Sequence, residues 1–273
     1  MQNMGGYHDL YLKSDVLLLA DIFENFRKFC KQYYKLYTCL YFTSPRLAFD
    51  AMLKMTKIEL ELMTDVDMFQ FIKKGLRGGD RYIANRRGRA NNKYVKEYNK
   101  KAPSKNIMYL DANNLYGWAM SQHLMTGGFK WLTDKEIDKV DMAKYKDESS
   151  TGLILEVDLE YPKELHNMHN CYPLSPEQLE VSSNMLSDYC ERTQARFNMS
   201  SAPDKKLIPN LMDYSKYVLH YRNLQLYLDL GLKIKMVHRA LQFNQSPWLK
   251  QHMDFNTQKR TLSKDSFEKG FFK

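Results

Sequence analysis

A single carboxylate lies where a strand-like run of residues meets an aromatic segment. The run Ile107–Leu110 is rich in residues that favour β-structure and leads directly into Asp111, and Tyr116 follows five residues later. We expect Asp111 to lie at the end of a strand, where a carboxylate can hold a divalent metal ion. The alternatives are a strand-end cap or salt-bridge partner for Asp111 and an ordinary core aromatic for Tyr116.

The segment around this carboxylate resembles a known motif. Asp111–Gly117 is similar to motif A of family B DNA polymerases, usually written D-x-x-S-L-Y-P. Asn114 stands where serine is common, and Gly117 stands where proline is common. By itself this similarity is weak, so its value depends on the rest of the chain.

Other pieces of the same family occur in the expected order on both sides of motif A. Tyr11–Asp15 resembles Y-x-x-x-D, the third motif of the proofreading 3′ to 5′ exonuclease, and Leu76–Gly79 resembles the Y-x-G-G loop between exonuclease and polymerase. Phe267–Lys273 resembles the approach to motif B, with Lys273 at the position of its lysine. The order of these pieces makes the resemblance specific.

The resemblance covers nearly the whole chain and is closest to the protein-primed branch of family B, in particular the Maverick/Polinton transposon group. It places the first two exonuclease motifs before Met1 and the rest of motif B and motif C after Lys273. We therefore expect an internal fragment of a larger polymerase. The sequence segments that carry this resemblance are 11–27, 105–131, 206–232 and 238–273.

The resemblance implies template-directed nucleotidyl transfer with two Mg²⁺ ions, dNTP substrates and a DNA template and primer. Asp111 would be one metal ligand, and its partner would come from motif C. Tyr116 would pack under the sugar of the incoming nucleotide, with Leu115 beside it in the nucleotide site. Because motif C is missing, the fragment alone is expected to bind DNA without polymerising.

Three cations near the C-terminus are candidate ligands of the nucleotide phosphates. The resemblance makes Lys273 a triphosphate ligand, where a cation offsets charge on the leaving pyrophosphate. Arg260 and Lys264 are four residues apart, so on one helix they share a face with each other and with Lys273. The alternative for Arg260 and Lys264 is an exposed surface cation.

An exonuclease half-site is the second candidate for metal chemistry. Tyr11 and Asp15 are four residues apart and would lie on one helical face. The resemblance makes Asp15 a metal ligand and Tyr11 the residue that positions the attacking water. The alternative is a tyrosine and aspartate near a helix start, with Asp15 as the cap. Proofreading is not expected without the upstream motifs.

The positive charge of the chain is concentrated in one stretch. Residues 73–105 contain twelve Lys and Arg against Asp80 and Glu97, a local charge of +10, while the whole chain carries +9. Such a stretch with glycines can follow a phosphate backbone, and a solvated basic loop is the alternative. The candidate DNA-binding residues are Arg77, Gly78, Gly79, Arg81, Arg86, Arg87 and Arg89.

Residues 163–250 resemble the insertion of protein-primed polymerases that holds the priming protein and DNA. The similarity is carried by Lys205–Asn210, by Lys216 and Tyr217, and by 220–222. The implied partner is a terminal protein, whose hydroxyl replaces a nucleic-acid primer. A generic polar helical insertion is the alternative.

We expect a reducing intracellular setting, in nucleus or cytoplasm, with no membrane partner. The four cysteines form no C-x-x-C pair, no apolar run is long enough for a membrane span, and the sequence shows no signal segment. A zinc site is a minor alternative to free thiols and ordinary histidines, because the spacing fits no compact finger. Its ligands would be His166, His169, Cys171 and Cys190.

Periodicity and capping residues predict the elements that position these side chains. Helices are predicted from Ser14 or Asp15 to Tyr37 and over 46–57, 115–120, 217–230 and 255–273. Strands are predicted over 106–110 and 152–161, paired in one sheet, and the basic stretch is expected to be a loop with short strands.

The predicted fold class is α+β: the C-terminal edge of an RNase H-like exonuclease, a partial polymerase palm with a helical insertion, and the start of the fingers. The predicted domains are 1–75 (exonuclease end and linker helices), 76–162 (palm with motif A), 163–250 (insertion) and 251–273 (start of fingers). Two other functions stay open at this point. One is a non-catalytic DNA-binding remnant of a transposon or viral polymerase, and the other is a nuclease that uses Asp15.

Overall fold

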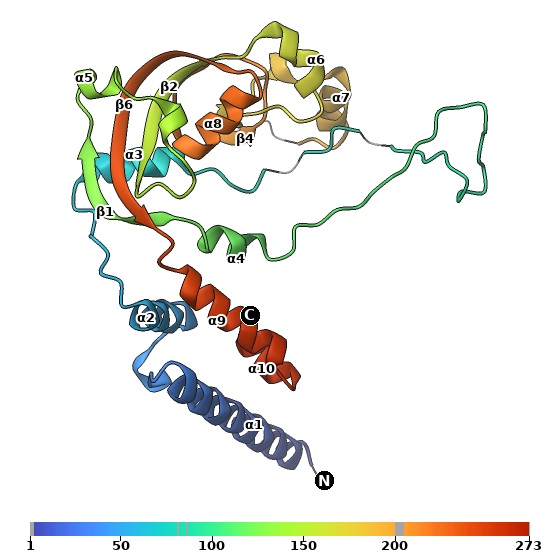
Figure 1. The fold of residues 1–273 in the computed structure, drawn as a ribbon. Helices are drawn as coiled ribbons and strands as arrows, with labels where there is room; N and C mark the ends of the chain where they lie inside the picture. Colours follow the sequence, from blue (N-terminus) through green and yellow to red (C-terminus); the bar gives the residue numbers. More distant parts are fainter. Residues whose placement is uncertain (1–2, 81, 86, 200–204, 273) are drawn as a thin grey trace. The chain divides into compact units, whose positions relative to one another are not determined.

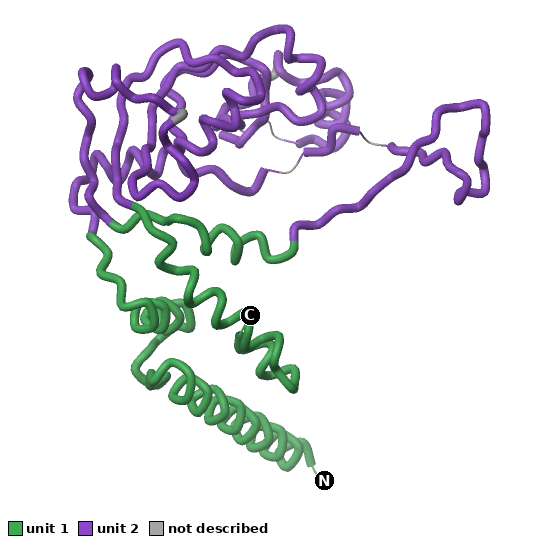
Figure 2. Tube along the Cα trace, in the orientation of Figure 1, with its two compact units in different colours: residues 1–61, 113–126, 245–273 green, residues 62–112, 127–244 purple. Residues whose placement is uncertain are grey.

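The protein consists of two compact units, each built from segments that are distant in the sequence (Figures 1 and 2). A computed structural model describes residues 3–80, 82–85, 87–199 and 205–272. Within this part of the chain, no helix has both the length and the apolar character needed to cross a membrane. Unit 1 comprises Met1–Glu61, Asn113–Thr126 and Gln245–Lys273, and unit 2 comprises Leu62–Ala112 and Gly127–Asn244.

Unit 1 is built around helices. Its core is formed where aromatic side chains of the long N-terminal helix meet those of the C-terminal helices, for example Phe29 with Phe267 (ring centroids 5.3 Å apart) and Tyr33 with Phe272 (5.0 Å). Edge-to-face contacts of this kind add to the free energy gained by burying the rings. The helices are α1 (Met4–Tyr33), η1 (Thr38–Leu40), α2 (Ser44–Thr56), α4 (Leu115–Met120), α9 (Lys250–Leu262) and α10 (Ser266–Phe271).

The first helix begins ten residues earlier than the sequence predicted. Asn3 caps α1 by accepting a hydrogen bond from the Gly6 amide (2.8 Å), so the helix begins at Met4. Ser14 lies inside the helix and donates its hydroxyl to the Leu10 carbonyl (2.8 Å). The prediction that Ser14 or Asp15 caps the helix is therefore wrong, because the pattern-based start overlooked the stronger cap upstream.

The second predicted helix is confirmed. α2 begins at Ser44, the Thr43 side chain accepts from the Arg46 amide, and Pro45 lies in the first turn, where its missing N–H costs nothing. Lys57 ends the helix in the left-handed conformation. The expected boundaries of 46–57 differ from the observed ones by two residues or fewer.

The C-terminal helix predicted over 255–273 is two helices. α9 ends at Leu262, and Asp265 starts α10 by accepting from the Glu268 amide (2.8 Å). The Glu268 carboxylate in turn accepts from the Lys264 amide (3.0 Å), which is a local arrangement that favours a new helix start. Lys264 thus lies between two helices and does not share a helical face with Arg260.

Unit 2 is organised by a curled antiparallel sheet with strand order β1-β6-β2-β5 (Figure 1). β2 lies in the middle of the sheet and pairs with β6 over most of its length, with bulges between Glu156 and Val157 and between Asp158 and Leu159. Bulges increase the local twist, which fits the curl of the long strand β6. The strands are β1 (Leu124–Trp131), β2 (Thr151–Glu160), β5 (Tyr214–His220) and β6 (Lys233–Ser246).

The core of unit 2 lies between this sheet and helix α8 (Tyr221–Asp229). β2 supplies alternate residues to the core, and α8 covers them with Tyr221 and Leu224, both fully buried. Alternation along a strand places these β2 residues on one face of the sheet. The β2 residues are Leu153, Leu155, Val157 and Leu159.

The sheet confirms one predicted strand and overturns another. The strand predicted over 152–161 is β2, and the helix predicted over 115–120 is α4. The strand predicted over 106–110 is absent: these residues are irregular and exposed, and they pair with no described strand. A β-rich sequence without a neighbouring strand leaves its backbone groups to water and does not form a strand.

The helix predicted over 217–230 is likewise only half correct. Residues 214–220 form β5, and the helix begins at Tyr221, where the His220 side chain accepts from the Arg222 amide (3.4 Å). The consecutive apolar residues 217–219 are buried on both faces of the sheet. Their sequence therefore lacks the alternation of apolar and polar residues that would have indicated a strand instead of a helix.

The remaining elements of unit 2 are short, and together with the units above they give a mixed, α+β structure. A second small sheet pairs β3 (Glu177–Glu180) with β4 (Lys205–Ile208), which puts strands into the region read as a helical insertion. The basic stretch is a loop, as predicted, but its described residues form none of the expected short strands, only an isolated bridge between Asn91 and Lys105. The helices are α3 (Val66–Gly75), α5 (Asp134–Ile137), η2 (Met142–Lys144), η3 (Lys163–Leu165), α6 (His166–His169), η4 (Ser183–Met185) and α7 (Asp188–Arg196).

Candidate nucleotide and nucleic-acid site

Asp111 lies on an exposed, extended segment. The four residues before it expose between 64% and 94% of their surface, and Asp111 itself is exposed. It makes no hydrogen bond or ion pair with any residue that the structure describes, and the described residues contain no group of three side chains able to hold a metal ion. The residues present therefore do not form a metal site by themselves, and Asp111 is a carboxylate available for an external partner.

The residues after Asp111 form a tight helix start that explains both departures from the motif. Asn114 adopts the left-handed conformation (φ 54°), which asparagine tolerates better than most residues. Its side-chain amide lies against Gly117, where an added Cβ would be only 2.3 Å from Nδ2. Asn114 and Gly117 thus depend on each other, and a larger residue at 117 would displace the amide.

The two predicted nucleotide contacts on α4 are open to solvent. Tyr116 exposes 86% of its surface and Leu115 exposes 55%. Neither is an ordinary core residue in this structure, so the alternative considered for Tyr116 does not apply. An exposed tyrosine in the first turn of a helix is accessible to a ligand.

Helix α4 packs against α9, and the helices of unit 1 surround a cavity of about 1000 Å³. Asn114 and Met120 line it from the α4 side, and Arg260 lines it from α9. The structure thereby brings Asn114, Met120 and Arg260 to one cavity. Lys264 is exposed in the connection between α9 and α10, and Lys273 lies outside the described residues.

A hydrogen-bonded chain of polar side chains also lines this cavity, and sequence analysis did not find it. The Tyr34 hydroxyl donates to Oδ1 of Asn256 (2.5 Å), and Asn256 Nδ2 lies 2.8 Å from Nε2 of His252. Burial raises the pKa of Tyr34 to about 12 and lowers the pKa of His252, so both stay neutral at neutral pH. The i, i+4 spacing of His252 and Asn256 was the available signal.

The predicted DNA-binding residues fall into three groups. Arg77 is engaged inside unit 2: its guanidinium donates to the Val218 carbonyl (2.6 Å) and lies 3.8 Å from the Tyr217 ring centroid. Gly78, Gly79, Arg87 and Arg89 are exposed, Gly79 has a φ of +83°, and Arg89 pairs with Glu97. Arg81 and Arg86 lie outside the described residues.

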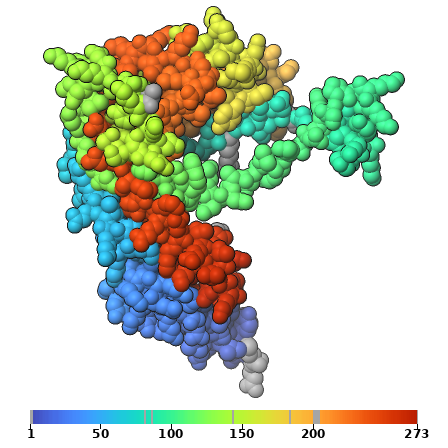
Figure 3. All heavy atoms as spheres, in the orientation of Figure 1, coloured from blue at the N-terminus to red at the C-terminus, as the bar shows by residue number. Residues whose placement is uncertain are grey.

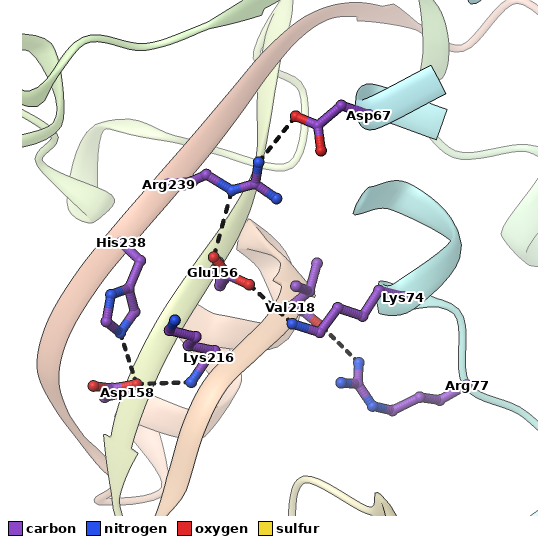
Figure 4. A network of polar contacts seen from close by, with 9 residues as sticks. All are labelled: Asp67, Lys74, Arg77, Glu156, Asp158, Lys216, Val218, His238 and Arg239. Carbon is purple, nitrogen blue, oxygen red and sulfur yellow. Dashed lines mark hydrogen bonds and ion pairs between the residues drawn. The ribbon is translucent and has the colours of Figure 1, made fainter. Parts of the chain in front are cut away.

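A network of charges on the second face of the sheet was missed by the sequence analysis (Figure 4). Glu156 of β2 is buried, accepts from Lys74 Nζ of α3 (2.9 Å) and lies 3.5 Å from Arg239 Nε of β6. Arg239 also pairs with Asp67 (3.0 Å). A buried carboxylate needs such partners, and a glutamate inside the apolar run 152–159 was the available signal.

A second carboxylate of β2 supports an unusual backbone conformation. Asp158 Oδ1 accepts from the Lys216 amide (2.7 Å) and lies 2.8 Å from His238 Nε2 (Figure 4). Lys216 is left-handed (φ 50°), which costs free energy for a residue with a Cβ. The Lys216 hydrogen bond and the nearby His238 lower the pKa of Asp158, so the charged carboxylate stabilises this bulge of β5.

The exonuclease-like pair lies on a fully exposed part of α1. The Tyr11 ring stacks on that of Tyr7 (6.4 Å between centroids), and Asp15 is exposed one turn later. No described Asp, Glu, His or Cys joins Asp15 in a group that could hold a metal. The structure therefore adds no further ligand to this half-site.

The histidines considered for zinc have other partners. His169 Nδ1 lies 2.8 Å from the Tyr161 hydroxyl, and His166 Nε2 lies 3.3 Å from the Tyr161 carbonyl. Cys171 is exposed and Cys190 is partly exposed, and both are free thiols. The described part of the chain does not bring these four side chains into a metal-binding group.

The fold and the site define a mixed α/β protein that joins an exposed motif-A carboxylate to a basic loop. Compared with known families, residues 8–273 match DNA polymerase type B, organellar and viral. The chain belongs to this family, and by family it is a DNA polymerase region, that is, a nucleotidyltransferase that acts with DNA. Members of this family generally use Mg²⁺ and dNTPs. No curated protein and no solved structure shows significant similarity to the chain.

Proposed function

We propose that the chain is the motif-A part of a protein-primed DNA polymerase that carries out template-directed nucleotidyl transfer. The observation that carries this proposal is the family match over 8–273, which includes the segment from Asp111 to Gly117. The start of α4 within this segment supports it, because α4 exposes Tyr116 to a ligand.

Each candidate residue has a role in this proposal. Asp111 contributes one carboxylate to a Mg²⁺ site whose other ligands come from a segment outside the described residues. Bound Mg²⁺ would stabilise the charge that develops on the reacting phosphate. Tyr116 and Leu115 contact the incoming nucleotide, and Arg260 reaches its phosphates from α9. Lys264 and Lys273 are further candidate phosphate ligands.

The larger assignments belong to the same proposal. Residues 1–75 form the end of an exonuclease domain in which Tyr11 and Asp15 are remnants of its third motif, residues 76–162 form part of a palm, and 251–273 start the fingers. Residues 163–250 bind a terminal protein that primes synthesis. The strands β3 and β4 and the sheet strand β5 give this insertion a folded structure on which a partner can dock.

The proposal is tested by nucleotide binding and incorporation. A fluorescent dNTP titrated in the presence of Mg²⁺ should bind about tenfold more weakly after Arg260→Gln, the loss of about 1.4 kcal/mol from one phosphate contact. In a polymerase chain extended to include motif C, Mg²⁺-dependent incorporation on a primed template should disappear with Asp111→Asn and persist with Asp80→Asn, another exposed carboxylate of unit 2.

Two outcomes would contradict the proposal. Incorporation that survives Asp111→Asn would remove this carboxylate from the chemistry. DNA binding without any dNTP binding would favour a non-catalytic DNA-binding protein, the second function considered from the sequence.

A further inference from the structure

The loop at residues 91–106 is a built structure within the basic stretch. Asn91 and Lys105 exchange both backbone hydrogen bonds (2.9 and 2.8 Å), which closes the loop at its base. We call this segment the asparagine loop. In the space-filling view the teal-green atoms of this part of the chain gather in a compact lobe (Figure 3).

Asparagine side chains hold the interior of the asparagine loop. Asn91 Nδ2 lies within hydrogen-bonding distance of three carbonyl oxygens, those of Asn99 (3.1 Å), Ala102 (3.3 Å) and Pro103 (3.0 Å), and Asn91 Oδ1 accepts from the Asn99 amide (2.8 Å). Asn92 Nδ2 donates to the Lys105 carbonyl (3.1 Å). Asn91 therefore replaces the hydrophobic core that so short a loop cannot build.

Both ends of the asparagine loop are tightened by local turns. Asn92 Oδ1 accepts from the Tyr94 amide (3.0 Å), and Asn99 Oδ1 accepts from the Lys101 amide (2.9 Å). Side chains that bond to a backbone amide two residues ahead fix the chain in a turn. The positions of the neighbouring lysines are thus set by the loop itself.

The asparagine loop presents cations and an aromatic ring to solvent. Its one acidic residue, Glu97, is paired with Arg89, which leaves the lysine charges uncompensated. Among described residues, none of the loop's lysines forms an ion pair. Tyr94 exposes 83% of its surface, and Lys93 Nζ lies 5.1 Å from its ring centroid. The lysines are Lys93, Lys96, Lys100, Lys101 and Lys105.

We propose that the asparagine loop binds a single-stranded nucleic acid, with its lysines on consecutive phosphates and an unpaired base stacked on Tyr94. Lysines spaced around one exposed aromatic ring are the arrangement by which proteins hold single strands without reading their sequence. A duplex offers phosphates to the lysines but no free base face to Tyr94. The inference rests on the proposed function, since a polymerase must hold an unpaired template strand.

The charge part is tested by fluorescence anisotropy with a labelled oligothymidine of about 20 nucleotides, longer than the ~4–16 nucleotides that one binding fold covers. The triple variant Lys96→Gln, Lys100→Gln, Lys101→Gln should bind at least tenfold more weakly. The slope of log affinity against log salt should become shallower by about 2, or about 0.7 per lost phosphate contact. The control removes the same charge from exposed lysines of unit 2: Lys135→Gln, Lys139→Gln, Lys146→Gln.

Base stacking on Tyr94 and the role of Asn91 in holding the loop are tested with separate variants. Tyr94→Leu should weaken binding of the single strand about tenfold with an unchanged salt slope. Tyr37→Leu, which removes an exposed ring of unit 1 that also has a lysine near it, should have no effect. Asn91→Ala should also weaken binding about tenfold although it changes no charge, because the loop no longer holds its lysines in place.

The outcomes separate this inference from the proposed function. A parent chain that binds neither single-stranded nor duplex DNA contradicts the proposed function. A parent chain that binds DNA but loses nothing in the loop variants overturns the loop proposal alone. Equal losses on single strand and duplex, with no effect of Tyr94→Leu or Asn91→Ala, show an unspecific charge effect and overturn it as well.

Discussion

Two segments of unit 2 that are rich in β-forming residues adopt different structures. Residues 152–157 of β2 are all buried in the middle of the sheet, whereas Ile107–Leu110, of similar composition, is exposed and irregular. The difference lies in the neighbours, because β2 has a paired strand on each side and Ile107–Leu110 has none among the described strands. Strand formation in this protein follows from available partners more than from residue preference.

The carboxylates of the same two segments differ in the same way. Glu156 is buried and satisfied by Lys74 and Arg239, so it stabilises the sheet and has no capacity for a ligand. Asp111 is exposed and has no partner among the described residues, so it is free to bind a ligand and contributes little to the stability of the fold. A carboxylate of this chain is therefore a candidate for binding a ligand where the fold leaves it exposed and without an ion-pair partner.

The largest effect is expected from a matched pair of leucines in these two segments. Leu155→Ala should lower the free energy of unfolding by about 2–5 kcal/mol, because Leu155 is only 1% exposed and its loss leaves a cavity. Leu110→Ala, at 80% exposed, should change it by less than about 0.5 kcal/mol. Urea denaturation followed by circular dichroism measures both. Similar losses at both positions would mean that Leu110 is packed.

The next effect concerns pH. Burial lowers the pKa of His220 from 6.5 to about 4, so the unfolded chain binds a proton that the folded chain refuses between these values. Stability should therefore fall as pH drops from about 6.5 to about 4, by up to about 3 kcal/mol from this group. His220→Asn, which can still cap α8, should remove that part of the fall.

The control for the pH experiment is His8→Asn, since His8 is exposed on α1. Its unfolding free energy should follow the same pH dependence as the parent chain. A parent chain whose stability is flat over this range, or a His220→Asn variant with an unchanged slope, would argue that His220 is solvated.

Removing the buried carboxylate should cost less than removing the buried leucine. Glu156→Ala leaves Lys74 and Arg239 without their shared partner, but both are partly exposed and Arg239 keeps Asp67. We expect a loss of about 1–3 kcal/mol in the free energy of unfolding. Asp254→Ala, which breaks the exposed pair with Lys250, should leave unfolding nearly unchanged. Comparable losses in the two variants would contradict the special position of Glu156.

The smallest effect separates an engaged arginine from an exposed one. Arg77→Ala should lower the free energy of unfolding by about 1 kcal/mol, since the Val218 carbonyl loses its donor. Arg87→Ala should leave the free energy of unfolding unchanged. It should make the slope of log DNA affinity against log salt shallower by about 0.7–0.9, the value for one lost phosphate contact. Thermal denaturation and anisotropy measured on both variants check this. The reverse pattern would show that Arg77 binds DNA and that its contact with β5 is dispensable.

Local signals in the sequence were sufficient for several elements. Ser44 and Pro45 marked the start of the helix predicted over 46–57, which α2 matches to within two residues, and the helix predicted over 115–120 is α4. These elements depend on capping and on neighbours three or four residues apart, which the sequence displays directly. The start of α1 and the break before α10 failed because Asn3 and Asp265, which are also local caps, were overlooked.

The candidate site was predictable in identity and much less in geometry. Asp111, Leu115 and Tyr116 lie in one short segment of the sequence, so a pattern can single them out. Arg260 comes to the same cavity as Asn114 only through the packing of α9 on α4. Arg77 was expected to contact DNA as part of a charge run, but its guanidinium contacts β5 in the structure. A charge run does not reveal which cation has a carbonyl within reach.

The sequence by itself determined the family, the order of the motifs, the location of the positive charge and the helices whose caps lie beside them. The tertiary structure alone decided which β-rich segment became a strand, which cations were engaged, and how distant segments combined into two units. The physical reason is that caps and periodicity act over a few residues, whereas pairing, burial and charge satisfaction depend on groups that are remote in the chain until it folds.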